Sequence, residues 1–92
     1  MATYLMFGKY SLEAMKAISA ERTSEAAALI KQQGGEFKAG YVLLGDIDLV
    51  LIADLPDTER AMKTSAALSK LLGISFSTAP AVSVEVFDKL MK

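Results

Sequence analysis

Two charged residues interrupt apolar patterns in this sequence and are therefore the first candidates for a functional site. Asp48 opens the apolar run Leu49–Ala53, where a carboxylate needs a partner to offset its lost hydration. Arg22 lies four residues after Ile18 and four before Ala26, on the apolar side of a predicted helix. We expect Asp48 to act as a general base or ligand anchor, and Arg22 to hold an anionic group.

Both residues also have structural explanations. Asp48 could accept main-chain N–H groups at the end of a hairpin, or pair with a cation. Arg22 could extend its charged end into solvent or pair with an acidic side chain. An ion pair between Arg22 and Asp48 would explain both exceptions without any function, so these alternatives stay open.

The three tyrosines could supply phenol hydroxyls to a pocket. We include Tyr4 and Tyr41 with Arg22 and Asp48 among the candidate ligand-binding residues, and Tyr10 is a further source of a phenol. Tyr41 also suits packing in the core or in a dimer interface, where its hydroxyl would need one partner. No residue is assigned as catalytic.

Cysteine and histidine are both absent from the sequence. Thiolate nucleophiles, histidine-based triads and ordinary zinc sites are therefore excluded. Asp46, Asp48 and Asp54 are not spaced like a known calcium loop. We expect no metal site and no cofactor.

Length and charge narrow the class of protein. The 92 residues predict a single small domain over 1–92. The net charge of −1 with scattered basic residues lacks the footprint of a nucleic-acid-binding protein. No apolar stretch reaches the about 18 residues of a membrane span, and the N-terminus does not resemble a signal peptide, so we expect a cytoplasmic protein.

The first half of the chain predicts a strand, a helix and a hairpin. Residues 2–8 read as a strand, and Ser11 caps a helix that ends at Gly34–Gly35, with a bend predicted between Ser19 and Ser24. Residues 36–44 and 47–54 read as strands joined by the two-residue turn Gly45–Asp46.

The second half predicts a helix, a strand and a short terminal helix. Asp57 caps the helix, Gly73 ends it, and residues 74–78 form a strand that Pro80 ends or marks as an edge. Ser83 caps the terminal helix within residues 83–91, although Val82, Val84 and Val86 also fit strand alternation. The methionines at 6, 15, 62 and 91 are expected to fill gaps in the core or in an interface.

This order of elements predicts an α+β fold of the ferredoxin-like βαββαβ type, with a four-stranded antiparallel sheet and two helices on one face. The strands contain unbroken apolar runs, at Leu5–Phe7, Tyr41–Leu44 and Leu49–Ala53, so both sheet faces should be buried. We therefore predict a homodimer that packs sheet face to sheet face. The alternative is that the terminal helix folds over the open face. That segment could also join dimers into a higher oligomer.

Several of these features together resemble the GYD domain family. They are the segment Gly45–Val50 after an apolar strand, the Gly-Gly-ended first helix with Arg22, and Pro56–Asp57 at the start of the second helix. The resemblance extends from about Thr3 to Thr78 and implies the dimeric α/β-barrel superfamily, which also holds small monooxygenases, dehydratases and amino-acid-sensing domains. Gly45 and Asp48 match the motif, whereas Ile47 replaces the namesake tyrosine.

The leading functional hypothesis is that a pocket between sheet and helices binds a small molecule. One alternative is a cofactor-independent oxygenase or isomerase-like enzyme, as the superfamily resemblance implies; it would depend on Asp48 or a tyrosine. A second is a structural or regulatory oligomerisation module without a ligand. Cavity volume separates the ligand-binding hypothesis from the oligomerisation module, because about 300 Å³ or more favours a ligand site.

Overall fold

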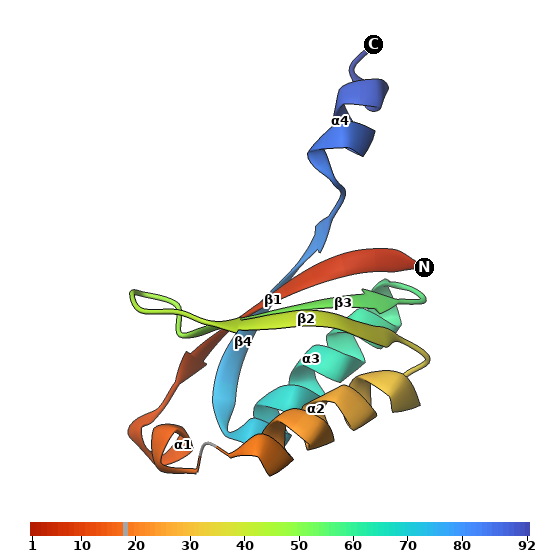
Figure 1. The fold of residues 1–92 in the computed structure, drawn as a ribbon. Helices are drawn as coiled ribbons and strands as arrows, with labels where there is room; N and C mark the ends of the chain where they lie inside the picture. The colour runs from red at the N-terminus through yellow and green to blue at the C-terminus, as the bar shows by residue number, and fades with distance from the viewer. Residues whose placement is uncertain (18) are drawn as a thin grey trace.

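The computed structural model describes residues 1–17 and 19–92, and Figure 1 shows how they are arranged. Four strands form one antiparallel sheet in the order β2-β3-β1-β4: β1 (Ala2–Tyr10), β2 (Glu36–Val42), β3 (Leu49–Leu55) and β4 (Ile74–Ala81). The helices are α1 (Leu12–Lys16), α2 (Ala20–Gln32), α3 (Thr58–Leu72) and α4 (Val84–Leu90). Helices α2 and α3 cover one face of the sheet, so the predicted ferredoxin-like α+β fold is confirmed.

The predicted helix boundaries in the second half of the chain are confirmed by their caps. The main-chain N–H of Arg60 donates to Asp57 Oδ1 at 2.7 Å, which starts α3. Gly73 ends α3 in the left-handed conformation with φ of 68°, which suits glycine. Ser83 accepts the N–H of Val86 and starts α4, so the helical interpretation of the terminal segment is correct.

The predicted first long helix is divided into α1 and α2. Ser19 is the N-cap of α2 and accepts the main-chain N–H of Arg22 at 3.3 Å, so the bend expected from Ser19 onward takes the form of a new helix start. Ile18, which the helical spacing assigns to the apolar stripe, lies outside the described residues. Met15 is exposed rather than in the core, because α1 contributes only Ala14 to the buried set.

The predicted two-residue hairpin turn is wrong. Residues 43–48 connect β2 to β3, and the Leu43 N–H donates to the Asp48 carbonyl at 2.8 Å. The Asp48 N–H donates to the Gly8 carbonyl of β1 at 3.0 Å. Asp48 is bonded to β1, so the connection between β2 and β3 is longer than a two-residue turn. Within this loop Gly45 has a φ of +151°, which suits glycine.

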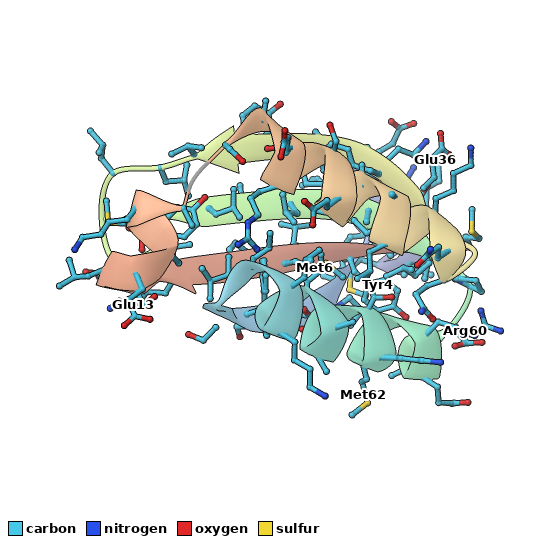
Figure 2. The ribbon with its side chains drawn as sticks, turned by 90° about the horizontal axis from the view of Figure 1, so that it is seen from below. Tyr4, Met6, Glu13, Glu36, Arg60 and Met62 are labelled. Atoms are coloured by element: carbon cyan, nitrogen blue, oxygen red, sulfur yellow. The ribbon has the colours of Figure 1, made fainter. Side chains whose placement is uncertain are left out.

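The core lies between the sheet and its two helices, and strand alternation decides which residues enter it. In β1, Tyr4 and Met6 are buried toward the helices, and Figure 2 shows both between α2 and α3. In β3, alternate residues from Leu49 to Leu55 are buried in the same layer. Met62 is exposed on the outer side of α3, so of the two places expected for it, the core or an interface, it does not occupy the core.

The other face of the sheet carries apolar residues in two rows across the strands, half-buried except for the exposed Tyr41. Leu5 pairs with Ile52, which pairs with Ala39. Phe7 pairs with Val50, which pairs with Tyr41. Helix α4 does not cover this face: it buries none of its residues and projects from the end of β4 (Figure 1). The alternative in which the terminal helix closes the open face is therefore wrong.

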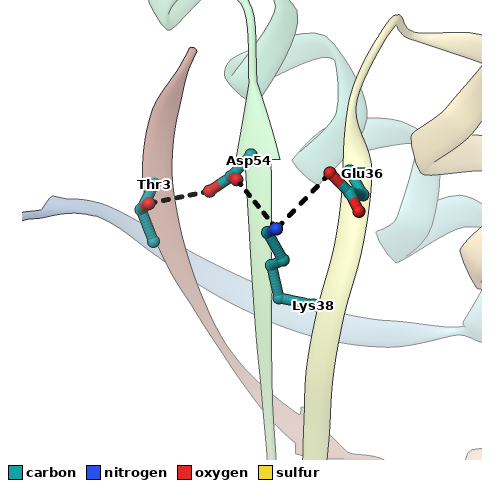
Figure 3. Close-up of polar contacts among 4 residues, drawn as sticks. All are labelled: Thr3, Glu36, Lys38 and Asp54. Atoms are coloured by element: carbon teal, nitrogen blue, oxygen red, sulfur yellow. Dashed lines mark hydrogen bonds and ion pairs between the residues drawn. The ribbon is translucent and has the colours of Figure 1, made fainter.

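One end of this open face is polar, as Figure 3 shows. The Thr3 hydroxyl donates to Asp54 Oδ1 at 2.7 Å, and Lys38 Nζ lies 3.6 Å from Asp54 and 3.4 Å from Glu36. A β-bulge between Phe37 and Ala39 lets Lys38 reach both carboxylates. The hydrogen bond with Glu36, followed by the attraction of both acidic groups, raises the pKa of Lys38.

Candidate functional site

A cavity of about 300 Å³ lies between the sheet and the helices, toward the end of the sheet where α1 and the β2–β3 loop lie. It is lined largely by apolar side chains from α1, α2, β2, β3 and the end of α3: Ala14, Ala26, Phe37, Leu49, Leu51 and Leu72. The residues of its wall that carry polar side-chain groups are Tyr10, Ser19, Arg22, Thr23 and Tyr41. An apolar enclosure with a few polar groups on one side is typical of a small-molecule site.

Arg22 is the charged residue of this wall among the described residues, and it is half-buried. It lies in the first turn of α2, where its main-chain N–H is held by Ser19. Its Nη1 donates to the carbonyl of Leu71 in the last turn of α3. This bond satisfies a carbonyl that the helix itself leaves free and pins the guanidinium at the edge of the cavity. The remaining N–H donors of the guanidinium can serve a ligand.

Asp48 has a different partner from the one that the ion-pair hypothesis gave it. Its Oδ2 accepts the main-chain N–H of Tyr10 at 2.9 Å. Within residues 1–17 and 19–92, the ion pairs are those that Lys38 makes, and an Arg22–Asp48 pair is not among them. Asp48 is half-buried and stands outside the cavity wall. Its bond matches the alternative in which this carboxylate accepts main-chain N–H groups at the hairpin end.

Tyr10 lines the cavity wall; the sequence named it as a further source of a phenol but did not place it among the four candidate ligand-binding residues. Burial raises the pKa of its phenol, and the nearby Asp48 carboxylate raises it further. The phenol therefore stays protonated at neutral pH, which suits it to donate a hydrogen bond rather than to accept a proton. Strand alternation could have placed Tyr10 on the cavity side of the sheet, because it lies an even number of residues from the buried Tyr4 and Met6 along β1.

The structure separates the two other candidate tyrosines. Tyr41 is exposed and borders the same cavity as Arg22, while its register with Val50 places it on the open face of the sheet. Tyr4 is buried and lines a second, more open groove of about 380 Å³ between α3 and β4. There its hydroxyl lies 3.5 Å from Thr58 Oγ1. The four candidates thus do not form one cluster.

A group of metal ligands or a membrane-spanning helix would each point to a further kind of function. In the part of the chain that the structure describes, no three potential metal ligands come together. No helix among the described residues has both the length and the apolar character needed to cross a membrane.

Comparison with known proteins assigns the family. The model of the GYD domain matches residues 4–91, so the chain belongs to the GYD domain family. No curated protein matches the sequence.

Among solved structures, the chain is similar to the Mycobacterium tuberculosis leucine response regulatory protein LrpA, with a TM-score of 0.60 at 7% identity. The match covers 90% of this chain and 51% of that one, so the chain spans about half the length of LrpA. At this identity the likeness concerns the fold alone.

Proposed function

We propose that the protein is a cytoplasmic homodimer that binds a small amphipathic carboxylate in the cavity beside Arg22. The observation that carries this proposal is a cavity of about 300 Å³ with an apolar wall and the Arg22 guanidinium at its edge. That volume reaches the size expected of a ligand site, which favours binding over a purely structural module.

The chemistry of the wall defines the ligand. An aliphatic or aromatic body would contact Leu51, Leu72 and Phe37, whereas its carboxylate would lie against Arg22. The first turn of α2 adds the favourable end of its helix dipole, because Ser19 and Thr23 also line the cavity. The protonated phenol of Tyr10 would supply a neutral hydrogen-bond donor.

Binding without catalysis is better supported than an enzyme. A cofactor-free enzyme of this type needs a base in the cavity, and the candidate Asp48 stands outside its wall with its carboxylate on the Tyr10 N–H. Tyr10 itself has a raised pKa and is a poor proton acceptor at neutral pH. Neither group therefore suits proton abstraction.

The homodimer is supported by the open face of the sheet. Leu5, Phe7, Val50 and Ile52 are half-exposed apolar residues on a face that no helix of the described chain covers. A second copy packed on this face by a two-fold axis would bury all of them at once. The polar end around Asp54 would then fix how the two faces align.

A ligand screen tests the binding proposal. We would compare aromatic and aliphatic carboxylates of matched size with the corresponding amides, and measure the melting temperature of the protein with each. Carboxylates should stabilise the fold, by about 2.7 kcal/mol at a concentration one hundred times Kd, whereas the amides should do much less. Equal responses to acid and amide would contradict the role of Arg22. Native mass spectrometry of the gently purified protein adds an independent readout, since reproducible extra mass would reveal the natural ligand.

A further inference from the structure

We infer that the C-terminal segment of each copy, residues 82–92, packs over the cavity mouth of a second copy, so that each cavity is closed by the partner's α4. This inference rests on the proposed dimer but does not require that a ligand be bound. We call residues 82–92 the arm.

The arm is apolar without a packing partner in its own chain. Helix α4 buries none of its residues, although Val84, Phe87 and Leu90 are large apolar side chains with 76%, 49% and 66% of their surface exposed. Ser83 caps the helix, so the segment has a defined shape as well as an apolar surface. A capped helix with such residues spaced three apart presents them on one side, as does a helix that docks in an apolar groove.

A second exposed apolar surface lies on α1, the end of β2 and the start of the β2–β3 loop, beside the cavity, and we call it the mouth patch. Apart from Met1 and Met62, the large apolar residues exposed in the described ranges belong either to the arm or to this patch. The patch consists of Leu12 and Met15 of α1 together with the consecutive residues Tyr41, Val42, Leu43 and Leu44. Its two parts belong to elements that both border the cavity, because Ala14 of α1 and Val42 of β2 line it.

The arm cannot reach the mouth patch of its own chain. It leaves the sheet after Ala81, which pairs with Thr3 at one end of β1. The patch lies at the other end of the sheet, where Gly8 pairs with Leu49 and Leu49 pairs with Val42. The molecule is 48 Å long, so the two surfaces are separated by much of its length. An arm that covers a mouth patch therefore covers that of another molecule.

A two-fold dimer brings the two surfaces together. Figure 1 shows α4 on the side of the sheet away from α2 and α3, which is the side where the second copy would pack. Suppose that the partner lies on the open face with its strands running opposite to those of the first copy. The end of the sheet where the arm of one copy begins then lies next to the end of the sheet where the other copy has its cavity. Both contacts are then identical by symmetry, and the assembly closes with each arm on a mouth patch. The groove between α3 and β4 includes Tyr4 and Pro80, which pair near the arm's own end of the sheet, so the partner's arm does not meet it in this arrangement.

Cysteine cross-linking tests the exchange directly, because the chain contains no cysteine. We would mix the single variants Val42→Cys and Phe87→Cys and treat them with a short bismaleimide. A cross-linked product that contains one chain of each variant is expected. The matched control pairs Phe87→Cys with Lys63→Cys on the exposed side of α3, and should give no product.

The outcomes separate this inference from the binding proposal. A dimer in sedimentation without the 42–87 product, or with a preferred 63–87 or 87–87 product, overturns the exchange and leaves ligand binding untouched. A monomer, or open assemblies larger than a dimer, also overturns it. In the full chain, the thiol of Val42→Cys should react with maleimide several-fold faster when Phe87→Asp is added. An unchanged labelling rate would show that α4 does not cover the mouth.

Discussion

The carboxylate of Asp48 accepts the main-chain N–H of Tyr10 at 2.9 Å, and this bond joins the β2–β3 loop to the end of β1. The Asp48 N–H completes the link by donating to Gly8 in the same strand. Asp48 is therefore a structural residue of the sheet end, and it acts on the cavity through Tyr10, whose phenol borders it.

Removing this acceptor should cost stability. Asp48→Ala leaves the Tyr10 N–H without its partner in a half-buried place, so we expect a loss of about 1–3 kcal/mol in the free energy of unfolding. Asp48→Asn keeps a carbonyl oxygen and should lose less. Urea denaturation of the two variants and the parent measures both effects. If Asp48→Ala were as stable as the parent, the hydrogen bond between the loop and β1 would contribute nothing to the free energy of unfolding.

The raised pKa of Tyr10 predicts a loss of stability in alkali. A phenol whose pKa is higher in the folded state than its usual value of 10.0 holds its proton more tightly when folded. Its contribution is present in full below pH 10 and is lost as the pH rises through the folded-state pKa. Tyr10→Phe should show a shallower decline over this range. Urea unfolding at a series of alkaline pH values measures the difference, and parallel curves for parent and Tyr10→Phe would contradict it.

Arg22 should decide the affinity for carboxylates. Replacing it with alanine removes charge-assisted hydrogen bonds, so we expect Kd to rise by about 10- to 100-fold, equivalent to about 1.4–2.7 kcal/mol. Arg60→Ala is the matched control, because Arg60 also donates to a main-chain carbonyl, that of Gln33, but lies outside the cavity wall. Isothermal titration with the best carboxylate of the screen gives both values. Equal losses in the two variants would point to a general charge effect.

Filling the cavity should abolish binding without unfolding the protein. Ala26 is buried and lines the cavity, so Ala26→Leu places additional methyl groups in the ligand space. Ala28→Leu, on the exposed side of the same helix, is the control. We expect no measurable binding in Ala26→Leu and a melting temperature near that of the parent, because the cavity accommodates the larger side chain. Retained affinity would mean that the ligand binds elsewhere.

A charge on the open face should dissociate the proposed homodimer. Val50 lies near the middle of that face, between Phe7 and Tyr41, and Val50→Asp would place two related carboxylates in the interface. Met62→Asp changes an exposed apolar residue on α3 and should leave the dimer intact. Sedimentation velocity distinguishes the species, and circular dichroism checks that the variant is folded. A Val50→Asp dimer of parental stability would rule out sheet-to-sheet packing.

The fold could be predicted from the sequence because its signals are local. Caps such as Asp57 and Ser83, the stop at Gly73 and the alternation of β3 each act through neighbouring residues. The hairpin turn could not be predicted, because its width depends on the bond between Asp48 and Gly8, residues far apart in the sequence. Gly45 and Asp46 alone carry no signal of that bond.

The candidate site was predicted only in part, for the same physical reason. Arg22 and Tyr41 both border the cavity, but the partner of the Arg22 side chain comes from the end of α3, which no spacing within α2 reveals. Tyr4 lines a different groove, because it lies toward the opposite end of β1 from Tyr10, beside α3 and β4. Sequence pattern thus identified the residue types, and tertiary packing decided which of them meet.

The unpacked state of α4 has a consequence for how the protein would respond to its own abundance. If a cavity is closed by another molecule, ligand occupancy and subunit association are thermodynamically linked, and each strengthens the other. Dilution alone would then release ligand, and a rise in expression would sequester it, with no competitor and no covalent change. The apparent affinity measured in vitro would depend on the protein concentration at which it was measured.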